Sequence, residues 1–141
     1  MNPGGSVKDR AALGILNDAI KNKKLKKNGI IVEGTAGNTG ISLTQLGNSI
    51  GCKTIIVMPE TQSNEKKQLL EILGAELILV PAVPYKNPNN YVKYSKKLSE
   101  DLSKKEKNKT VLWANQFDNP SNLNAHFNST GPEIWEQTCG K

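Results

Sequence analysis

The residue types best suited to binding an anion lie together in one glycine-rich stretch, Glu33–Gly40 (Glu-Gly-Thr-Ala-Gly-Asn-Thr-Gly). This stretch follows the apolar run Ile30–Val32 and precedes residues with helical spacing. A strand that leads through such a turn into a helix gathers free backbone N–H groups at the positive end of that helix, which favours a phosphate or a carboxylate. Glycine lets the backbone approach a ligand closely, while threonine and asparagine add donors and acceptors. An ordinary strand–helix turn with a threonine or asparagine cap has the same pattern, so the stretch alone leaves both interpretations open.

A second candidate for chemistry is Lys8, in the segment Ser6-Val7-Lys8-Asp9. This segment has the form of a capping box, which predicts Ser6 as the N-cap and Asp9 as the residue that reaches back to it. Apolar residues then recur with helical spacing through about residue 22, so Lys8 is predicted in the first turn of a helix. A surface lysine there would simply oppose the helix dipole. A lysine shielded from water would instead favour the neutral amine that Schiff-base chemistry requires.

A third polar cluster, Asn115–Pro120 (Asn-Gln-Phe-Asp-Asn-Pro), directly follows an apolar run that ends near Ala114. Gln116 within this cluster could hydrogen-bond a carboxylate. A turn stabilised by asparagine and aspartate side chains is the competing interpretation.

Alternating strand-like and helical segments separate the three candidate stretches. Strands are predicted at Ile30–Glu33, Lys53–Met58, Glu76–Val80 and Thr110–Ala114. After the helix that begins at Ser6, helices are predicted at Asn38–Ile50, Ser63–Leu73, Asn90–Leu102, Ser121–Asn128 and Pro132–Thr138. Short apolar strands separated by helices predict an α/β fold, an open parallel sheet with helices on both faces. Ligands bind such sheets at the carboxyl ends of the strands, where Glu33–Gly40 and Asn115–Pro120 would both lie.

Composition argues against several other classes of function. The 141 residues carry a net charge of +6, largely from two lysine clusters, Lys21–Lys27 and Lys104–Lys109. Both clusters follow helical patterns, as solvated helix ends do, and Arg10 is the only arginine, so nucleic-acid binding is not expected. The longest apolar run is too short to span a bilayer, so no membrane partner is expected. Two distant cysteines and one histidine predict no metal site, and unpaired cysteines suit a reducing compartment.

Taken together, these stretches resemble the cysteine synthase/cystathionine β-synthase family of fold-type II pyridoxal-phosphate enzymes. Asn2–Arg10 (Asn-Pro-Gly-Gly-Ser-Val-Lys-Asp-Arg) looks like the family's lysine segment, Glu33–Gly40 like its substrate loop and Asn115–Pro120 like its glutamine segment. Thr130–Trp135 (Thr-Gly-Pro-Glu-Ile-Trp) is also similar. The resemblance runs through nearly the whole chain in the family's order and spacing. It implies a tryptophan synthase β-like fold, of which this chain would be the smaller, N-terminal domain.

The resemblance also implies a role for individual residues. Lys8 would be the lysine to which pyridoxal 5′-phosphate is covalently attached, and Asn38 would hydrogen-bond the 3′ oxygen of this cofactor. Four residues would hold the carboxylate of the amino-acid substrate: Thr35, Gly37, Thr39 and Gln116. Position 36 is alanine, where much of the family has serine. A subset of cysteine synthases has alanine there as well.

The reaction implied by the resemblance is a β-replacement. Similarity to the cysteine synthases of the family implies a transferase that makes L-cysteine from O-acetyl-L-serine and sulfide, by elimination of acetate and addition of sulfide. Cystathionine β-synthase, which joins serine and homocysteine, is the alternative within the family. A non-catalytic remnant that binds a partner, or nothing, is the alternative outside it.

The family pattern extends beyond these residues. Its glycine-rich phosphate loop and the serine or threonine facing the pyridine nitrogen follow the glutamine segment, and further strands precede the lysine. We therefore expect a fragment, with residues 1–118 as the smaller domain and residues 119–141 as the return toward a truncated larger domain. The 141 residues alone are expected to be inactive. The complete enzyme is expected to be a cytoplasmic homodimer, or a mitochondrial one if a targeting segment lies upstream of Met1.

Overall fold

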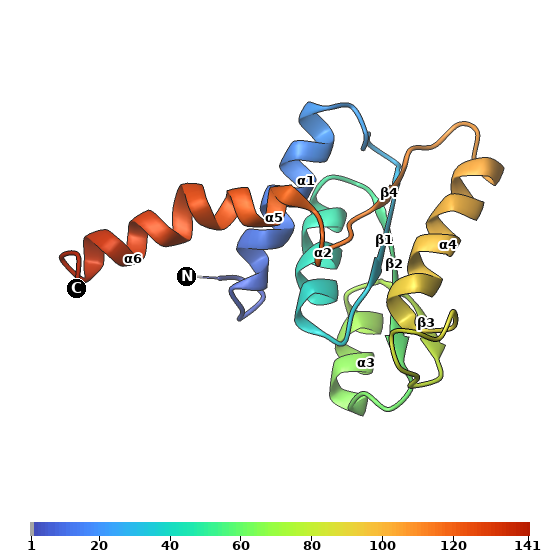
Figure 1. Cartoon of the computed structure of the whole chain (residues 1–141). Helices are drawn as coiled ribbons and strands as arrows, with labels where there is room; N and C mark the ends of the chain where they lie inside the picture. Colours follow the sequence, from blue (N-terminus) through green and yellow to red (C-terminus); the bar gives the residue numbers. More distant parts are fainter. Residues whose placement is uncertain (1) are drawn as a thin grey trace.

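Four parallel strands form one open sheet in the computed structural model, which describes residues 2–141 (Figure 1). The strands are β1 (Ile30–Gly34), β2 (Lys53–Pro59), β3 (Glu76–Val80) and β4 (Val111–Trp113). Their spatial order is β3-β2-β1-β4. The chain therefore moves outward in one direction through β3 and then returns to the other side of β1. Between β1 and β4 the order reverses, and ligands of open α/β sheets bind at the carboxyl ends of the strands at such a reversal.

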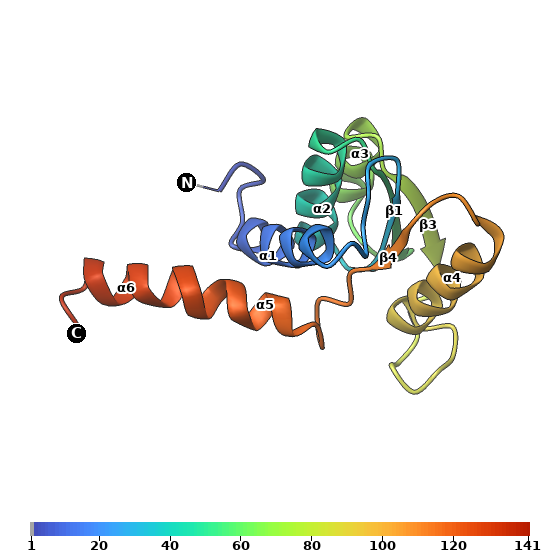
Figure 2. The same ribbon diagram turned by 90° about the horizontal axis from the view of Figure 1, so that it is seen from above.

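Helices cover both faces of the sheet (Figures 1 and 2). Three helices lie on one face and one on the other: α1 (Lys8–Lys21), α2 (Asn38–Ser49) and α3 (Asn64–Ile72), and, opposite them, α4 (Tyr91–Lys105). Alternation along β1 explains this arrangement, because Ile31 packs among residues of α1 and α2 whereas Val32 packs toward Leu98 of α4. All five residues of β1 are buried, as expected for a strand covered on both faces. The prediction of an open parallel sheet with helices on both faces is confirmed.

The start of α1 differs from the predicted capping box. The helix begins at Lys8, and Asp9 does not reach back to Ser6. Asp9 Oδ2 instead accepts from the backbone N–H of Gly4 at 2.7 Å, and Asp9 Oδ1 accepts from the Ser42 hydroxyl at 2.5 Å. The reason is the tight turn before the helix, in which Gly5 has φ +73° and the Gly4 N–H faces the Asp9 carboxylate. Asp9 thus joins this turn to α2.

The C-terminal residues form one continuous helical arm rather than the two separate pieces predicted. The arm consists of α5 (Pro120–Ala125), a π-helical turn η1 (His126–Thr130) and α6 (Gly131–Gln137). α5 packs on α1, where a Cβ at Gly14 would lie 2.5 Å from Ala125 Cβ, so the two helices cross too closely for any larger residue. Figures 1 and 2 show α6 projecting beyond the sheet and its helices. Within residues 2–141, no helix has the length and apolar character needed to cross a membrane.

Candidate functional site

All six residues predicted to contact cofactor or substrate line one cavity of about 290 Å³. Within residues 2–141, the lining is formed by Lys8, Thr35, Ala36, Gly37, Asn38, Thr39, Lys66, Tyr91, Gln116 and Phe117. The cavity lies at the carboxyl edge of the sheet, where the loop after β1 meets the loop after β4 and the first turn of α1. The fold therefore brings together three stretches that are far apart in the sequence.

The loop after β1 supplies the backbone part of this cavity. The Thr35 N–H donates to Val57 O at 3.0 Å, which continues the sheet by one residue, and the Gly37 N–H donates to Thr35 Oγ1 at 3.3 Å. α2 then begins at Asn38, so the positive end of a helix faces the cavity. A Cβ at Gly40 would lie 2.9 Å from Thr35 Cγ2, so glycine allows the helix to pack this close to the loop. The resulting geometry suits an anionic ligand.

A buried polar cluster forms the floor of the cavity. The Thr39 hydroxyl donates to Gln116 Oε1 at 2.5 Å, and Gln116 Nε2 donates to Glu33 Oε1 at 3.3 Å. These side chains are nearly inaccessible to solvent, with Glu33 only 1% exposed. Burial raises the pKa of the Glu33 carboxyl to about 8, against the opposing effect of hydrogen bonds from the backbone and side chain of Gln116 and from the backbone of Asn115 and Gly34. In the described part of the chain, Glu33 Oε2 and Asn115 Oδ1 are buried without a hydrogen-bond partner.

Two lysines reach the cavity from different helices. Lys8 is the first residue of α1, and Lys66 lies in α3; both are half-buried. Lys66 packs against the loop, since a Cβ at Gly37 would lie 3.1 Å from Lys66 Cδ. Ser6 Oγ accepts from the Lys8 N–H at 3.2 Å and from Asn38 Nδ2 at 3.4 Å, so it links the lysine segment to the loop. Two ammonium groups and one helix N-terminus make this cavity attractive to a negatively charged ligand.

Sequence reasoning missed four residues of this region. Lys66, Tyr91 and Phe117 line the cavity, and Glu33 lies beneath it. Phe117 is next to Gln116, so its place at the cavity could have been predicted from the sequence. Lys66 and Tyr91 belong to helices whose sequence pattern carries no sign of the cavity.

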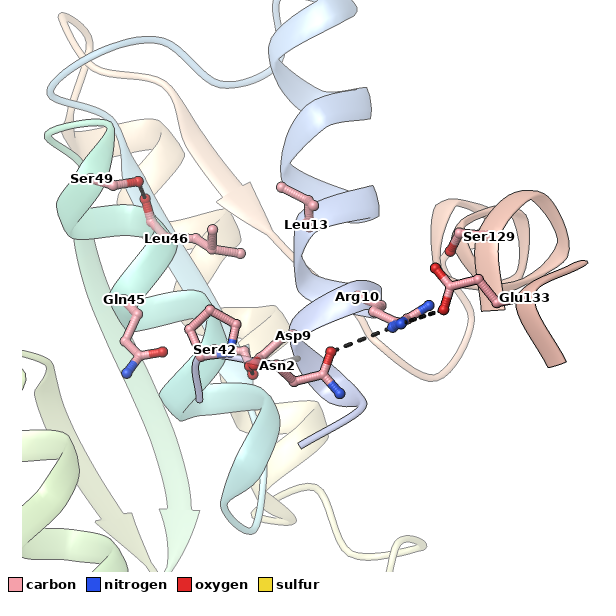
Figure 3. A pocket seen from close by; sticks show the side chains of 11 residues that line it. Asn2, Asp9, Arg10, Leu13, Ser42, Gln45, Leu46, Ser49, Ser129 and Glu133 are labelled. Carbon is pink, nitrogen blue, oxygen red and sulfur yellow. Dashed lines mark hydrogen bonds and ion pairs between the residues drawn. The ribbon is translucent and has the colours of Figure 1, made fainter. Parts of the chain in front are cut away.

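A larger cavity of about 660 Å³ lies between α1, α2 and the arm (Figure 3). Arg10 points toward the arm, where Nη2 donates to Glu133 Oε2 at 2.6 Å and Nη1 donates to Thr130 Oγ1 at 3.4 Å. The lysine segment is thereby joined to Thr130–Trp135, the fourth stretch of the family resemblance. Of the lining residues, only Asp9, Arg10 and Glu133 are charged. Asp9 is already hydrogen-bonded within the fold and the other two are paired, so the larger cavity offers little chemistry.

Comparison with known proteins places these features in context. A family model described as pyridoxal-phosphate dependent enzyme matches residues 1–141. The chain is 52% identical to cysteine synthase 1 of Neurospora crassa over 141 residues, which cover 100% of this chain and 36% of that protein. It is 50% identical to the cysteine synthase of Dictyostelium discoideum over 142 residues, covering 99% of this chain and 35% of that protein.

The fold has a counterpart among solved structures. The crystal structure of O-ureido-L-serine synthase superposes with a TM-score of 0.83 and 36% sequence identity, covering 99% of this chain and 42% of that chain. The chain is therefore similar in sequence to two cysteine synthases and in fold to O-ureido-L-serine synthase. The chain spans little more than a third of the length of the curated relatives named here.

Proposed function

We propose, from the premise that this chain belongs to the family of pyridoxal-phosphate dependent enzymes, that it forms part of the active site of a cysteine synthase. The proposed reaction converts O-acetyl-L-serine and sulfide to L-cysteine and acetate. The observation that carries this proposal is the convergence of the lysine segment, the substrate loop and the glutamine segment on one cavity of about 290 Å³. The 52% identity to a cysteine synthase along the whole chain supports the choice of reaction.

The residues around the cavity fit the cofactor. Lys8 offers an amine at the start of a helix, and the Asn38 amide is exposed and has only a 3.4 Å hydrogen bond to Ser6. We assign attachment of pyridoxal phosphate to Lys8 and a hydrogen bond to its 3′ oxygen to Asn38. When bound, the cofactor supplies an electron sink for negative charge that develops on the amino acid.

The remaining residues of the cavity would bind and orient the amino acid. Thr35, Gly37, Thr39 and Gln116 would hold its carboxylate at the positive end of α2. Lys8 Nζ would accept the proton from Cα as general base. Its place in the lining of the same cavity as the loop Thr35–Thr39 supports this role.

The domain division and the pairing of subunits belong to the same proposal. We assign residues 1–118 to a smaller domain and residues 119–141 to a return toward a larger one. The arm supports this division, because it leaves the sheet with large apolar side chains exposed: Leu123, Phe127, Ile134 and Trp135. Such side chains suit a surface covered by more protein, either a further domain or the second subunit of a homodimer. Free Cys52 and Cys139 are consistent with a cytoplasmic location.

A rate comparison tests the proposed reaction. In a protein that contains this chain, acetate release from O-acetyl-L-serine with sulfide should be much faster than condensation of L-serine with homocysteine. Both assays should use the same preparation, saturated with pyridoxal phosphate. A faster condensation of serine with homocysteine would overturn the assignment in favour of cystathionine β-synthase.

A further inference from the structure

Glu33 is a buried carboxyl group that the proposed reaction does not yet use. It lies near the carboxyl end of the central strand β1, directly beneath Gln116. Its Oε1 accepts one hydrogen bond from Gln116 Nε2, and its Oε2 has no partner in the described part of the chain. Backbone N–H groups of Gln116, Asn115 and Gly34 also favour the charged form of Glu33, but burial outweighs them and raises its pKa. A charged carboxylate is rarely buried without a cation. Its neutral form is far less costly to bury, and that form has a hydrogen to donate.

Among residues 2–141, Glu33 forms no ion pair that would hold it charged. α2 and β4 have no charged residue, and Lys53 of β2 lies at the far end of the sheet, paired with Glu76 at 2.5 Å. The cationic side chains at the cavity are Lys8 of α1 and Lys66 of α3. Neither of them contributes to the shift of the Glu33 pKa, which burial raises to about 8.

The other ionisable groups nearby are two acids and a phenol. Asp9 of α1 is hydrogen-bonded to the Gly4 N–H and to Ser42. Asp118 is an exposed residue of the loop after β4, and Tyr91 of α4 lines the cavity. None of these groups is among the causes that shift the Glu33 pKa. At neutral pH, Glu33 is therefore mainly the protonated acid.

The orientation of the Gln116 amide decides what the cavity can offer a carboxylate. With Gln116 Oε1 toward Thr39, the single hydroxyl hydrogen of Thr39 is used within the protein. A carboxylate needs donors, and in this arrangement Thr39 has none to give. The two ends of a glutamine amide have nearly the same shape, so the opposite orientation fits the same space. In that orientation Nε2 faces Thr39 Oγ1, and Oε1 faces Glu33.

Only a protonated Glu33 permits the turned amide. An ionised carboxylate opposite Gln116 Oε1 would bring two acceptors together, whereas the acid can donate its hydrogen to Oε1. Once the amide is turned, the hydroxyl hydrogen of Thr39 and a second hydrogen on Gln116 Nε2 are both free to face the cavity.

We propose that Glu33 is a positioning residue for the substrate carboxylate, because its protonated form can donate to Gln116 Oε1 and so permits the turned amide, in which Thr39 and Gln116 both present donors. This inference rests on the proposed function, since it deepens the assignment of Thr39 and Gln116 as carboxylate contacts. When Glu33 ionises, its proton passes to solvent, the amide returns to the opposite orientation, and both donors are withdrawn. Binding of the amino acid therefore weakens as pH rises through the Glu33 titration.

A ligand-free measurement tests the coupling between the two side chains. In the 141-residue chain labelled with ¹⁵N and ¹³C, the side-chain amide signals of Gln116 should shift with pH at the same midpoint as the Glu33 carboxyl carbon. Glu33→Gln should remove this shift. Glu65→Gln, which replaces an exposed carboxyl of α3, should leave it intact. Gln116 signals that stay constant while the Glu33 carboxyl titrates would overturn the proposal.

A binding measurement tests the consequence for the substrate. Equilibrium dialysis with radiolabelled L-serine, on the cofactor-loaded protein, should show affinity falling by about tenfold per pH unit above the Glu33 midpoint, the slope for loss of one proton. Glu33→Gln can still donate to Gln116 Oε1, so it should keep the affinity seen at pH 7 and lose this slope. Glu33→Leu cannot donate, so it should bind weakly at every pH. An unchanged slope in Glu33→Gln would contradict the carboxylate role.

The two measurements separate this proposal from the proposed function. If wild type and variants all fail to bind L-serine, the carboxylate role falls, whereas acetate release from O-acetyl-L-serine still decides the proposed function. The NMR titration still decides whether Glu33 orients Gln116. If L-serine binds but Gln116 does not follow Glu33, only the positioning role falls.

Discussion

The cavities of about 290 Å³ and 660 Å³ both adjoin α1, and they place carboxyl groups in opposite settings. At the smaller cavity, Glu33 is buried without a cation, and burial raises its pKa to about 8. At the larger cavity, the side chain of Glu133 is 48% exposed, and a hydrogen bond from Arg10 lowers its pKa. The larger cavity has the greater volume. The smaller one has the buried carboxyl group of Glu33, whose pKa is raised, together with the N-terminus of α2 and two lysines. Under the proposed function, the placement of charges points to the functional site better than cavity size does.

The largest difference in activity between the two cavities should appear when Lys8, at the smaller cavity, and Arg10, at the larger one, are each replaced by alanine. Lys8→Ala should reduce cysteine formation by about 10³-fold or more, because it removes the proposed general base as well as the proposed point of attachment for the cofactor. Arg10→Ala, which changes the larger cavity two positions away, should leave the rate within about threefold of wild type, a change of well under 1.4 kcal/mol. Steady-state kinetics on both variants checks this. Equal losses in the two variants, with normal folding, would contradict the distinction between the cavities.

The next effect concerns the pH dependence of stability at Glu33. The folded state holds the Glu33 proton up to a pKa of about 8, whereas the ordinary value for a glutamate is 4.5. Between these values the folded state binds more protons than the unfolded state, so the free energy of unfolding falls as pH rises, by about 1.4 kcal/mol per unit. Below pH 4.5 the Glu33 carboxyl is protonated in both the folded and the unfolded state, so its ionisation no longer changes the free energy of unfolding.

Urea unfolding of the wild type and of Glu33→Gln at pH 5 and pH 7 measures this effect. The wild type should lose on the order of 3 kcal/mol relative to Glu33→Gln over this interval. The same comparison for Glu65→Gln controls for the loss of an exposed carboxylate. Parallel curves for the wild type and Glu33→Gln would show that Glu33 is ionised in the folded protein.

The smallest effect should come from the ion pair between Arg10 and Glu133. Both side chains are partly exposed, and pairs of this kind contribute little because water and salt screen them. The sign is opposite to that of Glu33: with its pKa lowered, Glu133 stabilises the fold above its unfolded pKa and loses this effect in acid. Glu133→Gln should therefore change the urea midpoint only slightly at pH 7. A change as large as that at Glu33 would mean that the arm is held far more firmly than this contact implies.

Much of the sheet and the convergence of the site could be predicted from the sequence. Glu76–Val80 was predicted with its observed bounds. Two other strands end one residue later than predicted, and the fourth is one residue shorter at each end. Hydrophobic runs separated by helical patterns require a parallel sheet, and its carboxyl edge is where Gln116 meets the loop after β1. The family resemblance, which the comparisons confirm, then singled out Lys8 and Asn38.

The rest depended on contacts that no local pattern encodes. Lys66 and Tyr91 reach the cavity only because α3 and α4 pack where they do. A glutamate directly after an apolar run, such as Glu33, is typical of the exposed end of a strand. In the structure, Glu33 is buried instead, because β2, β4 and Gln116 cover it. The capping box failed at Asp9 because the Asp9 carboxylate accepts hydrogen bonds from the Gly4 N–H and the Ser42 hydroxyl instead. These are tertiary effects that override local preference.

The most direct test of the account is to find which lysine carries pyridoxal phosphate. Lys8 and Lys66 both line the cavity, so cavity position alone does not choose between them. The cofactor-loaded protein that contains this chain should be reduced with borohydride, digested and mapped by mass spectrometry. We predict a pyridoxyl group on Lys8 and an unmodified Lys66. A pyridoxyl group on Lys66, with Lys8 unmodified, would contradict the assignment of the lysine segment and the mechanism built on it.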